Sequence, residues 1–364
     1  MATPRYAGAN NGFLPVATAQ VVSYIRDPKK FKVNRYVQVL QAPAPHASYW
    51  KLDRHAPARV TSDAEFAWVD GAKSPTGHHN LANFALEPFQ TERRAYPFTL
   101  GNQAVKNAQK IGNLDLVSAH SKIVAQQAIT NRTNRIITLL TTASNWGSNY
   151  ATASTLNSGA GYWDYSSSVE TDSNAYAINK ALMEAVRRIN LGTNAKVQFS
   201  DLRLLLSPGA AIRMSNSGEI RNYVKYSRNA QSTLKDTMGN PNEQWGLPSH
   251  ISGVEIVVED CVIVTDKPYA GDSTEPTHSY VMPDDYAVLI SRPGEIDADF
   301  GAPSYSTVQC YFFSENGEEG GELEVETHEP NEGWDRMIEG RCVEQFAEVL
   351  AAPPTGFLIT DIMS

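Results

Sequence analysis

Two adjacent histidines, His78 and His79, are the residues whose types most invite a chemical role. Together with Asp70 or Glu87 they could bind a metal ion through imidazole and carboxylate ligands. Adjacent side chains on a strand point to opposite faces, so it is awkward for both imidazoles to reach one ion. We therefore expect no metal site here.

Two acidic segments and one glycine-rich segment have compositions that elsewhere bind calcium or phosphate. Asp284-Asp285 and Asp297-Ala298-Asp299 supply carboxylates. The twelve-residue spacing of a calcium loop is missing, so we interpret both as solvated turns. The run from Gly317 to Glu322 carries acids where a phosphate-binding loop needs bare backbone amides and a lysine, and it is not expected to bind phosphate.

The sequence lacks the local signatures of the common catalytic classes. It contains no Gly-x-Ser-x-Gly nucleophile elbow, no His-Glu-x-x-His zinc helix and no Gly-x-x-x-x-Gly-Lys-Ser phosphate loop. Without such signatures no residue can be given a catalytic role. We expect a protein that is not an enzyme, with no catalytic residue, metal or cofactor.

Length and composition describe a folded chain of more than one part. A chain of 364 residues favours two domains, and 41% apolar with 20% charged residues is typical of a folded protein. No apolar run approaches the ~20 residues that cross a bilayer, and we expect neither a signal peptide nor a membrane partner. Cys261, Cys310 and Cys342 are odd in number and far apart, which suits buried thiols in a reducing compartment.

Charge is distributed unevenly along the chain, whose formal net charge is -9. Residues 1–60 carry nine basic and two acidic side chains, whereas residues 281–364 carry eighteen acidic and three basic ones. Such ends can attract each other between copies, although an uneven solvated surface has the same composition. The basic run could also touch nucleic-acid phosphates without sequence specificity, but we favour contact with an acidic neighbouring copy. The expected contact residues are the basic Arg26, Lys29, Lys30, Lys32 and Arg35 and the acidic Glu318, Glu319, Glu322 and Glu324.

The first half of the chain is predicted to contain an arm, a long hairpin and a long helix. Residues 1–45 cannot bury enough apolar surface alone and need a neighbour to order them. Residues 46–97 hold strand candidates with too little core to be stable in isolation, so we expect the hairpin residue Trp68 to contact another copy. Gly112 ends any earlier helix. A helix is predicted over 114–142, with Asn113 as N-cap and with Leu116, Ala119, Ile123, Ile129, Thr133, Ile136 and Leu140 at helical spacing.

The second half is predicted to alternate short helices with strands. Glu259-Asp260 is expected to turn between two paired strands, and Gly320-Gly321 to make a second hairpin turn. The predicted elements are helices near 175–190, after Ser207 and after Asn216, and strands at 202–206, 254–258, 261–264, 287–290, 308–313, 323–327, 341–349 and 357–362.

The order of these parts is the most specific feature of the chain. It runs from Trp163-Asp164-Tyr165-Ser166-Ser167 through the helix near 175–190, the strand 202–206 and the two short helices to Gly246-Leu247-Pro248, Ile251-Ser252-Gly253-Val254 and Asp266-Lys267-Pro268. This order resembles that of the major capsid proteins of tailed bacteriophages, whose fold is named after phage Hong Kong 97. The resemblance covers about residues 46–364 and rests on order and spacing rather than on an invariant motif.

The resemblance implies an α+β, Hong Kong 97-like capsid fold. In that fold an N-terminal arm and an extended β-hairpin loop precede a long spine helix, a peripheral domain and an axial domain. The implied boundaries are 1–45 for the arm, 46–98 for the loop, 99–200 for the spine helix with the first peripheral part, 201–305 for the axial domain, 306–350 for the second peripheral part and 351–364 for the last axial strand.

The implied function is that of a major capsid protein, a structural protein of the virion that self-assembles in the host bacterial cytoplasm into an icosahedral shell around double-stranded DNA. Its implied partners are copies of itself in hexamers and pentamers, a portal protein, in some relatives a decoration protein, and packaged DNA that is contacted non-specifically. The loop already starts near His46, which leaves no room for a long removable scaffolding segment, so a separate scaffolding protein is implied. Some family members form a Lys–Asn isopeptide cross-link. Lys51 or Lys73 and Asn331 lie in the corresponding regions, but nothing local supports that chemistry.

Two alternatives stay open from the sequence. An encapsulin, a bacterial nanocompartment that holds a cargo enzyme, shares the capsid fold. An enzyme or binding module with a β-rich second domain belongs to another class, and a monomeric mass with saturable binding of a small ligand would favour it.

Overall fold

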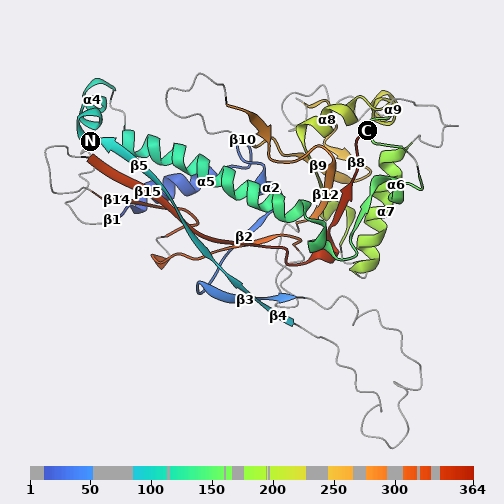
Figure 1. Cartoon of the computed structure of the whole chain (residues 1–364), viewed down its shortest axis with the longest axis horizontal. Coiled ribbons are helices and arrows are strands. Elements are labelled where there is room, and N and C mark those ends of the chain that lie inside the picture. Colours follow the sequence, from blue (N-terminus) through green and yellow to red (C-terminus); the bar gives the residue numbers. More distant parts are fainter. Residues whose placement is uncertain are drawn as a thin grey trace, which may run out of the picture.

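The computed structural model contains two six-stranded sheets connected by a long helix (Figure 1). It describes residues 12–51, 85–112, 115–159, 161–165, 176–193, 195, 197–226, 245–264, 276–292, 306–317, 320–328 and 337–364. Several residues singled out from the sequence lie outside this described part: Trp68, Asp70, Lys73, His78, His79, Asn113, Asp297, Asp299, Glu318, Glu319 and Asn331.

Strand β15 (Met337–Val349) is the central strand of the first sheet. Strand β5 (Glu92–Gly101) pairs antiparallel along one side of it. On the other side β14 (Glu324–His328) and β13 (Gln309–Phe312) lie end to end, because residues 339–343 of β15 face β14 and residues 346–349 face β13. The sheet is completed by β1 (Gly12–Phe13) beside β14 and by β2 (Gln38–Gln41) parallel to β13.

Helix α5 (Leu116–Thr141) packs across one face of this sheet and confirms the predicted long helix. Its N-cap is Asp115, whose Oδ1 accepts from the backbone amides of Val117 and Ser118 at 3.1 and 3.3 Å. At about 1.5 Å per residue it is roughly 40 Å long. The buried face differs from the expected one in one respect: Ile123 is 63% exposed, because Val124 and Ala125 take the core-facing positions in that turn.

The segment before the hairpin packs against its own chain. Helix α1 (Pro15–Ile25) lies against α5 and β14, and its Val21 and Ile25 are each only 1% exposed. Helix α2 (Val33–Tyr36) buries Tyr36 completely. The expected need for a neighbour is therefore met within the chain for residues 12–45, which corrects their interpretation as an arm. Helix α4 (Asn102–Gly112) ends at the glycine that was expected to stop it.

The second sheet has the strand order β6-β16-β12-β7-β9-β8. Neighbouring strands are antiparallel except for the parallel pairs β6–β16 and β7–β9. The strands are β6 (Tyr150–Thr152), β7 (Leu202–Leu206), β8 (His250–Ile251), β9 (Val254–Val258), β12 (Tyr286–Ser291) and β16 (Phe357–Thr360).

Helices α6 (Ala153–Leu156), α7 (Ala177–Gly192), α8 (Pro208–Ser215) and α9 (Gly218–Tyr226) share one core cluster with this sheet. The turn η3 (Phe199–Asp201) lies beside β9 and buries none of its residues. The predicted helices after Ser207 and Asn216 and near 175–190 are confirmed. The structure places residues 150–192 with the second sheet, although the expected boundary at residue 200 had assigned them to the peripheral part, because β6 pairs with β16 and α7 shares its core.

A second apolar cluster joins the two sheets. Trp146, in the turn η2 (Ala143–Trp146), is buried there, and its Nε1 donates to the carbonyl of Leu140 at 2.7 Å. The cluster draws residues from α2, α5 and both sheets, including Tyr36, Ile136, Leu205, Val288, Phe346 and Leu358. The turn η7 (Pro353–Thr355) leads back from the first sheet to β16.

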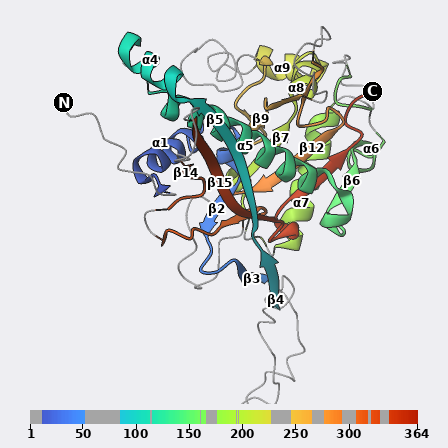
Figure 2. The same cartoon turned by 60° about the vertical axis from the view of Figure 1, so that its left-hand side comes forward.

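Two hairpins lie outside these sheets. β3 (His46–Lys51) pairs with β4 (Ala85–Gln90), and this hairpin projects away from both sheets (Figure 1, Figure 2). β10 (Val262–Val264) pairs with β11 (His278–Tyr280), so the predicted hairpin between residues 254–258 and 261–264 is wrong. The predicted hairpin turn at Gly320-Gly321 is also wrong, because β13 and β14 both pair with β15 and not with each other.

Candidate functional site: a buried ion cluster beneath the long helix

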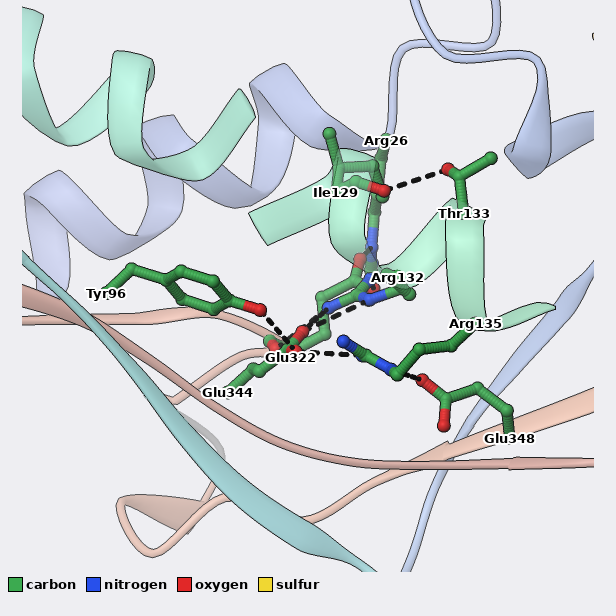
Figure 3. Close-up of polar contacts among 9 residues, drawn as sticks. All are labelled: Arg26, Tyr96, Ile129, Arg132, Thr133, Arg135, Glu322, Glu344 and Glu348. Atoms are coloured by element: carbon green, nitrogen blue, oxygen red, sulfur yellow. Dashed lines mark hydrogen bonds and ion pairs between the residues drawn. The ribbon is translucent and has the colours of Figure 1, made fainter. Parts of the chain in front are cut away.

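A group of charged side chains lies between α5 and the first sheet (Figure 3). Arg132 and Arg135 are three residues apart on α5, so both reach toward the same side of the helix. Glu344, Phe346 and Glu348 all lie on the helix-facing side of β15, because every second side chain of a strand points to the same face. The ion cluster is completed by Glu322, just before β14, by Arg26, just after α1, and by Tyr96 of β5.

Arg132 is the centre of the ion cluster. Its Nη1 lies 2.6 Å from Oε2 of Glu322 and its Nη2 lies 3.1 Å from Oε2 of Glu344. Nη2 also donates to the carbonyl oxygen of Glu322 at 3.3 Å. The guanidinium carbon sits 3.8 Å from the centroid of the Phe346 ring, a cation–π contact. Arg132 and Glu344 are 3% and 0% exposed, so this arginine and its acids are withdrawn from water.

Three further residues, Arg135, Tyr96 and Arg26, extend the ion cluster toward the surface. Arg135 donates from Nη2 to Glu344 at 2.9 Å and from Nε to Glu348 at 2.7 Å. The Tyr96 hydroxyl donates to Glu344 at 3.1 Å, and Arg26 donates from Nε to Glu322 at 2.7 Å. Three guanidinium groups thus face three carboxylates, and the ion cluster joins α1, α5, β5, β15 and the segment before β14.

The pairing sets the protonation of the ion cluster. Burial by itself would lower the pKa of Arg132, but the carboxylates of Glu322 and Glu344 outweigh it and the pKa is raised. The pKa of Arg135 is raised in the same way, against burial, by Glu344 and Glu348. Burial, and then the Glu344 carboxylate, raise the pKa of Tyr96. Both arginines and the phenol therefore keep their protons at all physiological pH values.

This arrangement can hold elements together but offers no group for catalysis. The arginines and acids satisfy one another, and no nucleophile or general base faces an open cavity in the ion cluster. Within the described ranges no group of three or more His, Cys, Asp or Glu side chains could hold a metal ion. The described helices include none that is long and apolar enough to cross a bilayer. We interpret the ion cluster as a structural clamp.

The structure places several of the expected contact residues in contacts within the chain. Arg26 pairs with Glu322, which is 2% exposed, and Arg35 pairs with Glu255 of β9. Glu324 is 7% exposed, and it accepts from Ser314 at 2.6 Å and from Asn316 at 2.8 Å. These four residues have partners within one copy, and a further contact of theirs with a neighbouring copy stays a prediction.

The remaining described contact candidates, which are lysines, have few polar contacts within the chain. Lys29 and Lys30 are exposed, and Lys32, the N-cap residue of α2, is partly buried and donates to the carbonyl oxygen of Lys29 at 3.4 Å. Lys30 lies 3.8 Å from Asp27, a long ion pair at the surface. A contact of these lysines, or of Trp68, Glu318 and Glu319, with a neighbouring copy stays a prediction.

The sequence reasoning missed the role of Arg132 and Arg135, which had been assigned to the favourable end of the helix dipole. One signal was present: α5 contains no acid at all, so Arg132, which is buried, and the partly buried Arg135 require acids from elsewhere. A second signal was the spacing of Glu344, Phe346 and Glu348, which places two acids and an aromatic ring on one face of a strand. Matching these acids to the arginines of α5 requires knowing that β15 packs beneath α5, which no local pattern specifies.

A second buried carboxylate, Glu259, lies where α2 meets the end of β9. It is 2% exposed, and it accepts from the Tyr36 hydroxyl at 2.8 Å and from the Cys261 amide at 3.1 Å. Burial raises its pKa to about 7; Tyr36, the Cys261 amide and Lys32 act to lower it and Asp260 acts to raise it. The pKa of the neighbouring Cys261 thiol is likewise raised to about 12, first by burial and then by Glu259.

We expect Glu259 to make stability fall as pH rises between its ordinary pKa of 4.5 and about 7. Because the folded state holds the proton more tightly than the unfolded chain, the contribution is complete below 4.5 and is lost as pH passes 7. The loss should be on the order of 3 kcal/mol. Denaturant titrations of wild type and Glu259→Gln across this range should give a difference curve of that sign. A Glu339→Gln control, exposed on β15, should give none, and a flat wild-type minus Glu259→Gln difference would contradict the assignment.

Comparison with known proteins bears on the fold. No family model matches the chain, and no curated protein matches it in sequence. A phage-related protein from Bordetella bronchiseptica RB50 is similar in structure with a TM-score of 0.61 at 14% identity, over 97% of this chain and 98% of that one. The capsid of cyanophage P-SCSP1u gives 0.48 at 9% identity, over 99% and 91% of the two chains. The mature capsid of bacteriophage PhiM1 gives 0.47 at 12% identity, over 99% and 90%.

The likeness to the phage-related protein extends over nearly the full length of both chains, so it concerns the whole arrangement of sheets and helices and not one shared motif. The order of elements along this chain had implied an α+β capsid fold. The chain therefore shares the fold of that phage-related protein, and the mixed helix-and-sheet architecture implied by its sequence is confirmed.

Proposed function

We propose that this chain is the major subunit of an icosahedral capsid, a structural protein that assembles into the head shell of a tailed phage around double-stranded DNA. The observation that carries the proposal is the fold, shared over nearly the whole chain with a phage-related protein. A fold can host more than one function, so the proposal also draws on surfaces that are incomplete in a single copy.

The β3–β4 hairpin is one such surface. It extends from the body of the molecule, its Leu86 is half exposed, and Phe89 stacks on Tyr311 with ring centroids 4.3 Å apart at its base. A two-stranded hairpin in water is marginal by itself. Contact with a neighbouring copy would bury apolar surface of the hairpin that its own chain does not cover.

The absence of a convergent reactive group in the ion cluster agrees with a structural role. Its acids and arginines are matched, and their effect is to fix α1, α5 and the first sheet together as one rigid unit. A subunit that must fit many identical neighbours benefits from such rigidity.

The proposed partners follow from this function. They are further copies of the chain in hexamers and pentamers, a portal protein, a separate scaffolding protein, in some assemblies a decoration protein, and DNA held without sequence specificity. The proposed location is the virion, after assembly in the bacterial cytoplasm.

Assembly tests the proposal. The purified chain, supplied with the scaffolding protein encoded beside it, should form closed particles of many copies, measured by mass photometry and sedimentation. Monomers or dimers alone under those conditions would contradict it. Closed particles that enclose a cargo enzyme and no DNA would instead favour the nanocompartment alternative.

A further inference from the structure

One face of the molecule carries lysines and almost no acids. The 26 residues of α5 include no Asp or Glu, and between residues 12 and 51 the sole acid is Asp27. This is unusual in a chain with 40 acidic and 31 basic residues. The acids that pair with α5 come from the sheet and lie beneath the helix, so they do not reach its outer surface.

The lysines of this face lie close together in space. α1 packs beside α5 on the same side of the first sheet, since both contribute to one apolar cluster with Val325 and Cys342. The two helices border an open hollow of about 780 Å³ whose lining includes Tyr24, Lys30 and Lys122. We call the exposed side of α1, α5 and residues 26–32 the lysine face.

The lysines there are available for a partner. Lys29, Lys30 and Lys122 are exposed, and neither Lys29 nor Lys122 forms an ion pair with another residue of the described ranges. Lys30 has only the 3.8 Å contact with Asp27 and lies 4.7 Å above the Tyr24 ring. Arg26 differs from them, because Glu322 neutralises it.

Amide side chains accompany these charges. Gln126, Gln127 and Asn131 are exposed on the outer side of α5. Lysine ammonium groups and side-chain amides are the usual donors to phosphate oxygens, and together they hold a backbone without reading its sequence. A surface of this kind, on which Asp27 is the one acid among the lysines of residues 26–32, attracts a polyanion, since an added phosphate meets few opposing carboxylates.

The opposite side of the sheet has a different character. Arg341 alternates with the helix-facing Cys342 on β15 and so points away from α5. It pairs with Glu326 at 2.6 Å, and Arg93 pairs with Glu315 at 3.2 Å. Glu315 and Glu326 are thus already engaged by arginines of their own chain, whereas Glu339 on the same side is exposed. The two paired acids are weaker partners for the lysines of another copy than free phosphates would be.

We propose that the lysine face binds the phosphate backbone of double-stranded DNA and is the face of the subunit turned toward the lumen of the shell; this inference rests on the proposed capsid function. Each lysine acts as a point charge that displaces a counterion from the duplex, so binding is independent of sequence and weakens steeply with salt. The choice of DNA over a second copy follows from the scarcity of acids on the lysine face and from the arginines that already engage Glu315 and Glu326 on the sheet side.

A charge-matched pair of variants tests this proposal. The face variant is Lys29→Gln/Lys30→Gln/Lys122→Gln. The control variant, Lys180→Gln/Arg213→Gln/Lys225→Gln, removes the same charge from α7, α8 and α9 on the second sheet. Binding of a short duplex of mixed sequence to the unassembled full chain is measured by fluorescence anisotropy at several salt concentrations.

The face variant should lose about 2–3 units of the slope of log K against log salt, close to one unit per lysine, while the control keeps the wild-type slope. If both variants lost the same part of the slope, the effect would come from net charge alone and not from the lysine face, which would overturn the proposal. An unchanged slope in the face variant, with altered particle yield, would also overturn it and would assign the lysines to contacts between copies.

Particles separate this inference from the proposed function. If wild type and both variants form shells, the face variant should retain less DNA after packaging, and equal retention would overturn the inference while leaving the capsid function intact. If wild type forms no shells, the capsid function fails whatever the duplex measurement gives.

Discussion

Replacing Arg132 by Ala should lower the free energy of unfolding by about 3–5 kcal/mol, because it removes the one fully buried cation shared by Glu322 and Glu344. The two buried carboxylates then keep only the more exposed Arg26 and Arg135 as partners. The cation–π contact with Phe346 is lost as well. Urea unfolding of the unassembled chain, followed by circular dichroism, measures the change.

Arg341→Ala is the matched control for that prediction. Arg341 also pairs with a glutamate, Glu326, at 2.6 Å, but it is 53% exposed, and such surface pairs contribute only about 0–1 kcal/mol. Equal losses in the two variants would show that the ion cluster under α5 is no more than a surface pair. A triple variant, Arg132→Met/Glu322→Gln/Glu344→Gln, should recover part of the loss, since it removes the unpaired charges together with the arginine.

Trp146→Ala should cost a similar amount, about 3–5 kcal/mol, by opening a cavity in the apolar cluster that joins the two sheets. It also removes the donor to the carbonyl of Leu140. Because the cluster includes residues of both sheets, we expect the single unfolding transition to broaden as the two parts lose their coupling, which calorimetry detects.

Phe199→Ala is the control for that second prediction. Phe199 is an aromatic residue of the second sheet's periphery and is 40% exposed, so its truncation should cost less than about 1 kcal/mol. If Trp146→Ala lowered the free energy of unfolding as little as Phe199→Ala does, the apolar cluster around Trp146 would not be what couples the two sheets.

Elements with a local signal were predictable from the sequence. Leu202–Leu206 is an apolar run interrupted only by Arg203 and stopped by Ser207-Pro208. It becomes β7 followed by α8, and the Ser207 hydroxyl caps the helix at the Ala210 amide. The 3.6-residue period likewise predicted α5 over nearly its full length. In both cases the stop and start signals lie within the segment itself.

Pairings between distant segments were not predictable in the same way. Val254–Val258 and the apolar run after it looked like neighbours joined by a turn, yet β9 pairs with β7 and β10 pairs with β11. Strand patterns specify which faces are apolar but not which edges meet. The same limit hid Glu219, whose carboxylate accepts from the Ile178 and Asn179 amides at 2.9 Å and so holds α9 against the start of α7.

The ion cluster was not predictable for a related reason. Net charge along the chain suggested that basic and acidic ends meet between copies. Arg26 and Glu322 also meet inside one copy, 296 residues apart in sequence. A count of charges cannot separate contacts within a chain from contacts between chains, whereas the structure shows this pair within the chain.

Electron cryomicroscopy of particles assembled from the full chain tests the central claim most directly. We predict closed icosahedral shells built of hexamers and pentamers, with the two-sheet subunit intact, the Arg132 ion cluster formed within each copy and the β3–β4 hairpin packed on a neighbouring copy. Dispersed single subunits in the presence of scaffolding protein, or shells in which the hairpin touches no neighbour, would contradict that account.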